Sequence, residues 1–570
     1  EEITVTARKR VENLQDVGTS ISALGAAELQ RRFDADLQSF ANAAPNLIID
    51  DIQQGPGSPA AISIRGVGTT DVEKNFDPTV GVVVDGVFIG VNSGAMIKAI
   101  DLERIEVLRG PQGTLFGRNS IGGVINVLRG KPRVDGFGGE FRAGAGNYGD
   151  RLLDGYINVP VGETFAFRLG GALRQNDGWY YNRTLDRDSG EMEYTQLSPS
   201  VLWKPTENLE IYYRFDKTEQ DQDANTVLNL AQPDQAWCFF YGQCAQGVQT
   251  PQSGDRYTVL QNGDGSPDGT PYQSYFDTEL HIVNVNWELA DAYTVNYVFG
   301  DFSTEEEVYQ DWDGTALTLY HTDRPATWNQ QSHELRLTYT GERLTYTAGL
   351  YYWESDYRID LLSYIGFGDL LFGLPSGTVL QVPQTVAQNT ESTAFFVEGD
   401  YEFNDSWTLT LGGRYTKDKK DSGLIDPIMP QLAVKGSLDN PFEEEWDEFT
   451  PKASLKYRLN EDVMMYGLYS KGSVFFMKYD DKQEEQSVPT SQGTGQQTLV
   501  VNASSVEIRG LEIDFASVIT ENFTLAGNLG LLDAEYKKLV DPITQTDLSY
   551  LKLRRAPDYT ATLSPTYTLE

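Results

Sequence analysis

The sequence contains no apolar run that approaches the roughly 18 residues a membrane-spanning helix requires. Basic side chains are also few, with 45 Lys and Arg against 83 Asp and Glu, and the formal net charge is −38. This balance argues against nucleic acid and anionic lipid headgroups as partners. The acidic segments at residues 305–307 and 443–448 are either solvated loops or sites that attract divalent ions and cationic ligands.

Histidine and cysteine are scarce. The three histidines, His281, His321 and His333, offer few general bases, and no Ser, His and Asp spacing stands out, so we expect no catalytic residue. With six methionines, they also argue against capture of bare copper or zinc, and we predict no metal site and no cofactor. The two cysteines, Cys238 and Cys244, predict a small disulfide-closed loop formed in an oxidising compartment.

The second half of the chain alternates apolar and polar residues. The pattern is clear at residues 164–174, 407–418 and 523–531, and half-buried strands produce it. Since no helix can span a membrane here, a membrane location would require a barrel of such strands. A soluble sandwich also alternates, but its strands are usually shorter and its loops more even in length.

Loop lengths separate these two architectures. Short turns recur at residues 161–163, 341–343 and 520–522, whereas residues 217–271 and 355–390 form long polar connections. Short turns on one rim and long loops on the other are typical of an outer-membrane barrel. Aromatic residues near the predicted strand ends suit the girdles of such a barrel.

Residues 81–128 hold the most informative pattern. Two short apolar strands, 80–84 and 87–90, flank Asp85-Gly86, which is the pair that a two-residue hairpin turn requires. The glycine-rich segment 110–117 lacks the Gly-Lys-Ser/Thr ending and the following helix of a phosphate-binding loop. Its glycines are better explained by tight turns and close packing.

With the ISIRG run at residues 62–66, these segments resemble, in order and spacing, the plug domain of TonB-dependent outer-membrane receptors. The resemblance implies an all-β membrane protein of the Gram-negative outer membrane. Its fold would be a 22-stranded antiparallel transmembrane β-barrel with an N-terminal mixed α+β plug inside the lumen. We expect a TonB box and extension at residues 1–9, the plug at 10–135 and the barrel at 136–570. A barrel of 22 strands would have an open lumen unless the plug filled it.

Counting strands predicts missing segments. When strands alternate up and down, the short turns stay on one rim until about residue 472. Beyond it, the short turn at 520–522 would fall on the rim of the long loops. One absent descending strand would restore it, so we expect a gap near residues 472–473. The run 560–570 ends mid-strand, without a terminal aromatic. About 17 visible strands, one near 472 and about four beyond 570 give the 22 that the resemblance implies.

The first residues, Ile3, Thr4, Val5, Thr6 and Ala7, combine β-branched alternation with an exposed terminus. They form either a disordered end or a segment that adds as a strand to a partner's sheet. The resemblance identifies them as a TonB box, which pairs with TonB of the TonB–ExbB–ExbD energy-coupling complex, and we expect ordering only when TonB is bound. We expect a transporter and not a transducer, because no signalling domain stands before the box in this sequence, unless residues before Glu1 have been removed.

Two arginines, Arg65 and Arg109, resemble a plug pair that faces barrel carboxylates in the family. A charge inside a protein-filled lumen needs a partner, and arginine offers a bidentate fork. The pair is either a latch that a pull can break or a stabiliser of the plug alone. Glu398 is the candidate barrel partner.

Ligand contacts are expected at the plug apices and the long outer loops. The candidates are Asn75, Phe76, Asn92, Trp237, Phe239 and Tyr241, although loop aromatics also pack among themselves. The resemblance implies TonB-dependent active import of a scarce external ligand, by default an iron–siderophore complex, with a carbohydrate, cobalamin or an aromatic compound as alternatives. A passive porin, a surface-binding barrel and an enzyme are the other classes. Outer-membrane lipid and lipopolysaccharide are the remaining partners.

Overall fold

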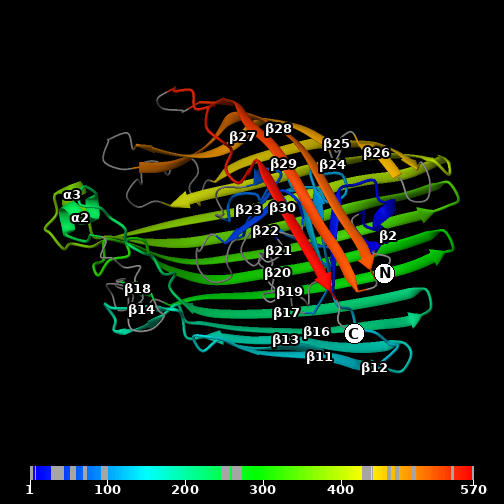
Figure 1. Ribbon diagram of the computed structural model, residues 1–570, viewed down its shortest axis with the longest axis horizontal. Coiled ribbons are helices and arrows are strands. Elements are labelled where there is room, and N and C mark those ends of the chain that lie inside the picture. Colours follow the sequence, from blue (N-terminus) through cyan, green and yellow to red (C-terminus); the bar gives the residue numbers. More distant parts are fainter. Residues whose placement is uncertain are drawn as a thin grey trace.

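A computed structural model of the chain describes residues 4–6, 8–26, 41, 44–51, 60–68, 74–91, 101–244, 257–259, 273–425, 438, 441–458, 464–468, 474–489, 496–520, 522–540 and 545–567. No helix among them is both long and apolar enough to cross a membrane. Long antiparallel strands form a curved wall, and shorter strands from the start of the chain lie inside its curve (Figure 1).

The inner unit, which we call the plug, is made of short strands. One sheet has the order β3-β9-β10-β7-β8, another the order β4-β5-β6, and β1 pairs with β2. The bounds are β1 Thr4–Val5, β2 Glu12–Asn13, β3 Ile21–Gly25, β4 Leu47–Asp51, β5 Ala60–Ile64, β6 Val67–Gly68, β7 Val80–Val84, β8 Val87–Ile89, β9 Leu102–Arg109 and β10 Gly123–Arg129, with a 3-10 turn at Leu14–Asp16.

The hairpin predicted at Asp85-Gly86 is confirmed. It joins β7 to β8, and both turn residues have positive φ, 48° and 94°, as a two-residue turn of this kind requires. Strand β7 is buried along its whole length, which explains its uninterrupted apolar sequence. The Asp85 carboxylate accepts a hydrogen bond from the Arg129 N–H at 2.9 Å and so ties the turn to β10.

The wall consists, among the described residues, of a 13-stranded and a four-stranded antiparallel sheet. The first contains β11 Gly138–Ala145, β12 Arg151–Val161, β13 Phe165–Asn176, β16 Met192–Thr206, β17 Leu209–Asp223, β19 Gln273–Ala290, β20 Tyr293–Asp311, β21 Tyr320–Thr340, β22 Leu344–Ile365, β23 Leu380–Asn404, β24 Trp407–Ile425, β25 Phe442–Arg458 and β26 Met464–Leu468. The second contains β27 Val474–Pro489, β28 Gln496–Thr520, β29 Phe523–Leu539 and β30 Tyr559–Tyr567.

Apolar side chains of the wall face outward and polar ones face the plug. On β24, Leu411 and Tyr415 are about half exposed, whereas Thr410 and Arg414 are buried. A soluble sandwich would show the reverse, with its apolar face turned to the core. An apolar exterior around a polar interior is the arrangement of a membrane barrel, and the predicted plug-and-barrel architecture is confirmed.

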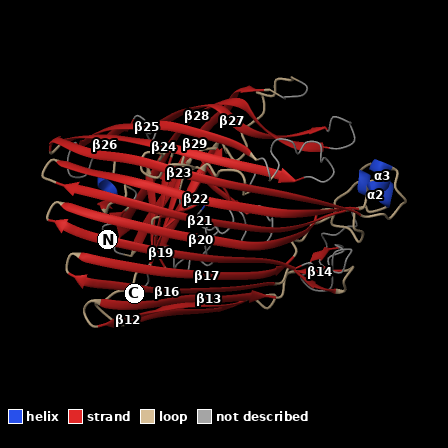
Figure 2. Cartoon of the chain, turned by 180° about the vertical axis from the view of Figure 1, so that it is seen from behind, coloured by secondary structure: helices blue, strands red, loops and turns tan. Residues whose placement is uncertain are grey.

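Connections differ at the two rims of the wall. Two or three residues join β12 to β13, β21 to β22 and β23 to β24 at one rim. The other rim carries the longer connections, with the short strands β14 Tyr180–Asn182, β15 Arg187–Ser189 and β18 Tyr257–Val259 and the helices α2 Ala236–Tyr241 and α3 Gly368–Phe372 (Figure 2). We call these the short-turn rim and the long-loop rim.

The two wall sheets break between β26 and β27. Strand β26 pairs with β25 and β27 with β28, and no pairing between β26 and β27 occurs within the described residues. If the two-residue connection after β28 lies on the short-turn rim, β26 and β27 run in the same direction. The gap near 472–473 and the strands beyond residue 570 stay predictions.

The plug packs directly against the inner face of the wall. The β7–β8 hairpin shares one apolar core with side chains of β19 to β22. Gln330 of β21 accepts a hydrogen bond from the Gly90 N–H at 2.8 Å and donates one to the Phe88 carbonyl at 2.6 Å. A Cβ at Gly90 would lie 2.7 Å from the Trp353 ring, so glycine permits this close approach.

Candidate functional site

The two plug arginines converge on one carboxylate of the wall. Arg65 donates from Nε and Nη2 to the two oxygens of Glu512 on β28, at 2.8 and 2.6 Å. Arg109 Nη1 lies 3.2 Å from the same carboxylate, and Asn46 Nδ2 donates to it at 2.9 Å. All four side chains are buried, and a buried pair that loses one partner is strongly destabilised.

A tight turn presents Arg65 to the wall. Arg65 and Gly66 join β5 to β6 with φ values of 56° and 75°, the geometry of a two-residue hairpin. A Cβ on Gly66 would lie 2.9 Å from the Cβ of Ala556, so the turn lies against the connection between β29 and β30 of the wall. The turn therefore fixes both the direction of the guanidinium and its distance from Glu512.

Glu398, the candidate partner of these arginines, has other contacts. It accepts a hydrogen bond from Arg8 Nε at 2.9 Å and one from Lys452 Nζ at 2.7 Å. Arg8 also donates twice, at 2.7 Å, to Asp400. Although burial opposes its charge, Glu398 and Asp400 outweigh that cost and raise the pKa of Arg8. The wall carboxylate that contacts Arg65 and Arg109 is thus Glu512 and not the candidate Glu398, because strand alternation does not tell which plug segment lies opposite.

Arg8 is the first of three consecutive basic residues docked on the wall. Lys9 Nζ lies 3.3 Å from Glu334, and Arg10 pairs with Asp400. Burial is the largest influence on Lys9 and lowers the pKa of its amine, although Glu334 opposes the shift. This segment follows the predicted TonB box, so the box is anchored beside the inner face of the wall.

The described part of the predicted box is folded onto the plug. Thr4 and Val5 pair with β2, and Val5 is fully buried. The Thr6 N–H donates to the Glu106 carboxylate at 2.7 Å, and Asn126 holds that carboxylate from the other side. Ordering was expected only with TonB bound, but these contacts order Thr4–Thr6 within the chain alone. Ile3 and Ala7 lie outside the described residues.

At the plug apex, Asn75 and Phe76 are half-buried, and Asn92 lies outside the described residues. The next residue, Asp77, pairs with Arg118 of the plug at 2.9 Å and with Lys420 of β24 at 3.0 Å. The Arg118 and Lys420 side chains lower the pKa of the Asp77 carboxyl. The apex is thus tied to the wall next to the candidate ligand residues.

The loop aromatics lie on α2, at the far end of the long-loop rim (Figure 1). Cys238 and Cys244 form a disulfide that closes this loop. Trp237 packs on Phe367, with ring centroids 5.5 Å apart, and the Tyr241 hydroxyl donates to Asp369 at 2.5 Å.

Phe239, in contrast, is 68% exposed. Two of the three candidates on α2 therefore pack within the loops.

Sequence reasoning missed Glu512, Glu106 and the partners of the basic segment. A signal for Glu512 exists in the alternation of β28, because Leu511 and Ile513 face outward while Glu512 is buried. An acid on the inward side of such an alternation marks a lumen charge that needs a partner. Glu106 gives no such signal, because its partner Thr6 lies in a separate segment.

Two family models match the chain. The model described as TonB-dependent Receptor Plug Domain matches residues 13–124, and the model described as TonB dependent receptor-like, beta-barrel matches residues 220–473. The first therefore covers most of the plug strands and the second covers wall strands β19 to β26.

Curated relatives are more distant. The iron-regulated outer membrane virulence protein of Vibrio cholerae is 31% identical over 134 residues, which are 22% of this chain and 20% of that protein. The pesticin receptor of Yersinia enterocolitica is 24% identical over 439 residues, 72% of this chain and 54% of that protein. The chain thus matches about half the length of the pesticin receptor and a fifth of the virulence protein.

Solved structures share the fold. The ferric yersiniabactin uptake receptor FyuA from Yersinia pestis superposes with a TM-score of 0.74 at 16% identity, covering 97% of this chain and 84% of that one. The siderophore receptor PiuA from Acinetobacter baumannii gives 0.69 at 15% identity, covering 98% and 85%. Identities this low establish the architecture alone.

Proposed function

The chain belongs to the TonB-dependent outer-membrane receptors of Gram-negative bacteria, and from that membership we propose that it imports an external ligand actively. In this scheme the ligand binds at the long-loop rim and the plug apex. TonB, energised through ExbB–ExbD, captures the N-terminal box and pulls on the plug. The wall carries no covalent chemistry, so the protein acts as a transporter and not as an enzyme.

The observation that supports this proposal most is the way the plug is held. Arg65 and Arg109 contact a single wall carboxylate, Glu512, while the box segment is held by Glu106 of the plug itself. These contacts are polar and local, so a directed pull can break them one after another. The strands of the wall, which are joined by backbone hydrogen bonds, remain paired. A passive porin would need neither the box nor the plug.

We propose an iron–siderophore complex as the cargo. The names of one relative and two solved structures support this class: ferrioxamine receptor, ferric yersiniabactin uptake receptor and siderophore receptor PiuA. A chelate needs aromatic and hydrogen-bonding surface, which the exposed Phe239 and the half-buried Asn75 and Phe76 offer. Cobalamin is the second candidate, because a vitamin B12 transporter of Vibrio vulnificus is 29% identical over 125 residues.

Growth of a receptor-deficient Gram-negative strain that expresses the chain tests the cargo. Iron-limited cells are given ferric yersiniabactin, ferrioxamine or a ferric catecholate, and a parallel culture requires cobalamin. We expect growth on at least one ferric chelate, lost when TonB is deleted or when Val5→Pro prevents strand pairing by the box. Growth on cobalamin alone would make cobalamin the cargo in place of an iron–siderophore complex. Growth that survives TonB deletion would overturn active import.

A further inference from the structure

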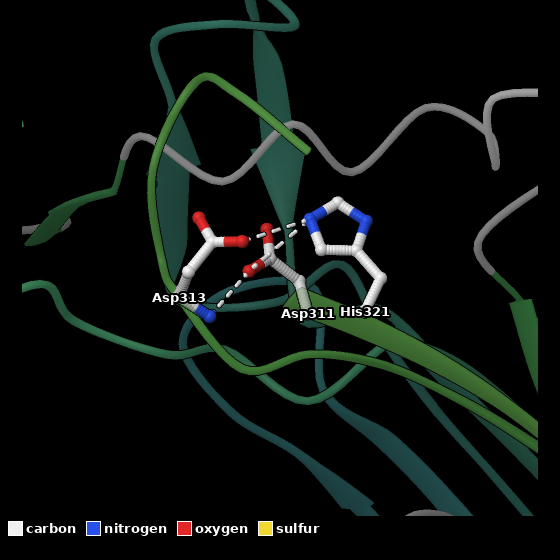
Figure 3. A group of neighbouring side chains, drawn as sticks. All are labelled: Asp311, Asp313 and His321. Atoms are coloured by element: carbon white, nitrogen blue, oxygen red, sulfur yellow. Dashed lines mark hydrogen bonds and ion pairs between the residues drawn. The ribbon is translucent and has the colours of Figure 1, made fainter. Parts of the chain in front are cut away.

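A compact group of potential metal ligands lies at the long-loop rim, where β20 ends and β21 begins (Figure 3). His321 Nε2 lies 3.2 Å from Asp313 Oδ2 and 3.6 Å from Asp311 Oδ1. One ligand atom from each residue falls within 4.8 Å of the others, and all three side chains are at most 2% exposed. Within the described part of the chain, this is the single group of its kind.

The loop between the two strands is folded so that these side chains meet. Asp311 Oδ1 accepts hydrogen bonds from the N–H groups of Asp313 and Gly314, at 3.0 and 2.8 Å, which turn the chain as β20 ends. Asp313 Oδ2 then accepts from the N–H groups of Leu319 and Tyr320, at 3.0 and 2.8 Å. The second set brings the start of β21 back, and the histidine follows directly.

One oxygen of the two carboxylates accepts no hydrogen bond within the described residues. Asp311 Oδ2 is buried and has no hydrogen-bond partner within the described residues, although Oδ1 of the same carboxylate is satisfied. A buried carboxylate oxygen without a donor is costly, and two carboxylates beside one imidazole leave negative charge uncompensated. A Cβ on Gly314 would lie 2.8 Å from the Val227 carbonyl, so the neighbouring loop covers the group.

The spacing fits a small divalent ion. Zinc binds imidazole nitrogen and carboxylate oxygen at about 2.0–2.2 Å in a tetrahedron, which sets its donors about 3.3–3.5 Å apart. The distances of 3.2 and 3.6 Å from His321 Nε2 bracket that value. An imidazole among the ligands favours zinc and similar transition metals over calcium and magnesium.

We propose that Asp311, Asp313 and His321 form a structural site for a divalent transition-metal ion of the zinc class, which fastens the end of β20 to the start of β21. The fourth ligand is a water molecule, as is common at zinc sites with three protein ligands. The expectation from the sequence was that the chain has no metal site. That expectation followed from the low number of histidines and did not consider that two strand ends bring one histidine between two carboxylates.

A tyrosine orients the imidazole. The Tyr309 hydroxyl lies 3.0 Å from His321 Nδ1, which directs Nε2 toward the two carboxylates, and metal-bound histidines commonly have a partner on the second nitrogen. The chain also offers a matched control. His333 makes the same contact with Tyr297, at 2.8 Å, but belongs to no such ligand group.

The proposed ion is not the cargo of the importer. The group is buried beneath a neighbouring loop, whereas a transported ligand must enter and leave during each cycle. Its role is to hold the loop between β20 and β21, against which the backbone of Val227 and Asn229 lies. The site therefore stands whether or not the chain imports siderophores, and its test requires no cargo.

Zinc binding to the purified chain in detergent is the first test. The protein is kept oxidised, so that Cys238 and Cys244 cannot bind zinc, then stripped with a chelator and titrated with zinc in excess magnesium. Magnesium occupies weak carboxylate sites elsewhere. We expect one tightly bound zinc per chain by elemental analysis. Failure of the wild-type chain to retain zinc under these conditions would overturn the proposal.

Variants locate the bound ion. Asp311→Asn keeps the Oδ1 acceptor for the two backbone N–H groups but removes the charge, and His321→Gln removes the imidazole. We expect each to weaken zinc binding by about 100-fold or more, since even residues that only support a ligand cost 10–100-fold. His333→Gln should bind zinc as the wild type does. Equal retention by His321→Gln and the wild type would exclude the site.

A measurement on the unaltered chain covers the case in which the variants fail to fold. X-ray absorption at the zinc edge of the wild-type protein should give one imidazole nitrogen together with oxygen ligands, at about 2.0–2.2 Å. A shell of oxygen atoms without imidazole would place the zinc at surface carboxylates and overturn the assignment.

Discussion

Arg65 of the plug and Glu512 of the wall form a bidentate ion pair across 447 residues of sequence, with both side chains almost completely buried. Arg109 approaches the same carboxylate, so one glutamate faces two plug cations. The pair is the polar joint between a short hairpin turn of the plug and a strand of the second wall sheet. Its strength should decide how firmly the plug is held.

Substitution of Glu512 should loosen the plug. Glu512→Gln removes the carboxylate charge that both buried arginines contact, and breaking a buried pair in this way costs about 3–5 kcal/mol. We expect faster amide hydrogen exchange at residues 60–68 and a lower urea midpoint for the plug, while the wall strands keep their protection. Glu507→Gln on the same strand, whose carboxylate pairs with Arg509 and Lys537, is the control. Equal protection of residues 60–68 in both variants would contradict the joint.

Glu106 should control access to the N-terminal box. Glu106→Ala removes the acceptor of the Thr6 N–H and of the Asn126 amide, so the paired segment Thr4–Val5 loses its support. We expect faster proteolysis at the N-terminus and tighter binding of a TonB C-terminal domain, because less energy is needed to release the segment. Glu103→Ala, at a half-exposed neighbour, should change neither, and unchanged proteolysis in Glu106→Ala would refute the docking role.

The contact between α2 and α3 should depend on acid. The hydrogen bond from the Tyr241 hydroxyl is the main cause that lowers the pKa of the Asp369 carboxyl. A lowered folded-state pKa means that the contact is fully present above the ordinary carboxyl pKa of about 3.9 and is lost as pH falls through the lower value. Docking should therefore be constant from neutral pH down to about pH 5.

Tryptophan quenching measures this docking. The described residues contain no free cysteine, so a bimane label at Leu370→Cys on α3 is specific, and Trp237 on α2 quenches it. We expect quenching to decrease only under strongly acidic conditions, and Tyr241→Phe to remove the pH-dependent step. A transition near pH 6 would assign the contact to another group.

The close approach at Gly90 predicts a packing defect. A Cβ there would meet the Trp353 ring at 2.7 Å and the Gln330 side chain at 3.0 Å. Gly90→Val must therefore push the β7–β8 hairpin off the wall, and overpacking of this kind costs about 1–3 kcal/mol. Thermal unfolding should shift downward, whereas Gly136→Val, where a Cβ meets nothing within 4 Å, should leave it unchanged.

The sequence predicted those features of the fold that depend on residues close together in the chain. Asp85-Gly86 gave the hairpin, since few pairs adopt two consecutive positive φ values, and alternation gave the strands of the wall. The identity of contact partners was not predictable in the same way. Glu512 lies hundreds of residues from Arg65, and Glu398 sits on an equally good inward position but faces Arg8. Sequence spacing does not contain the register between plug and wall.

A reversible tether between plug and wall tests active import most directly. A Cβ on Gly412 of β24 would lie 3.0 Å from the Thr114 methyl group of the plug, so Thr114→Cys with Gly412→Cys can form a disulfide across the interface. Uptake of the labelled ferric chelate that supports growth is measured in cells before and after reduction, with the wild type under the same reductant as control. Active import through plug movement predicts no uptake while the tether is closed and recovery after reduction. Uptake by the oxidised tethered protein at the wild-type rate would contradict it.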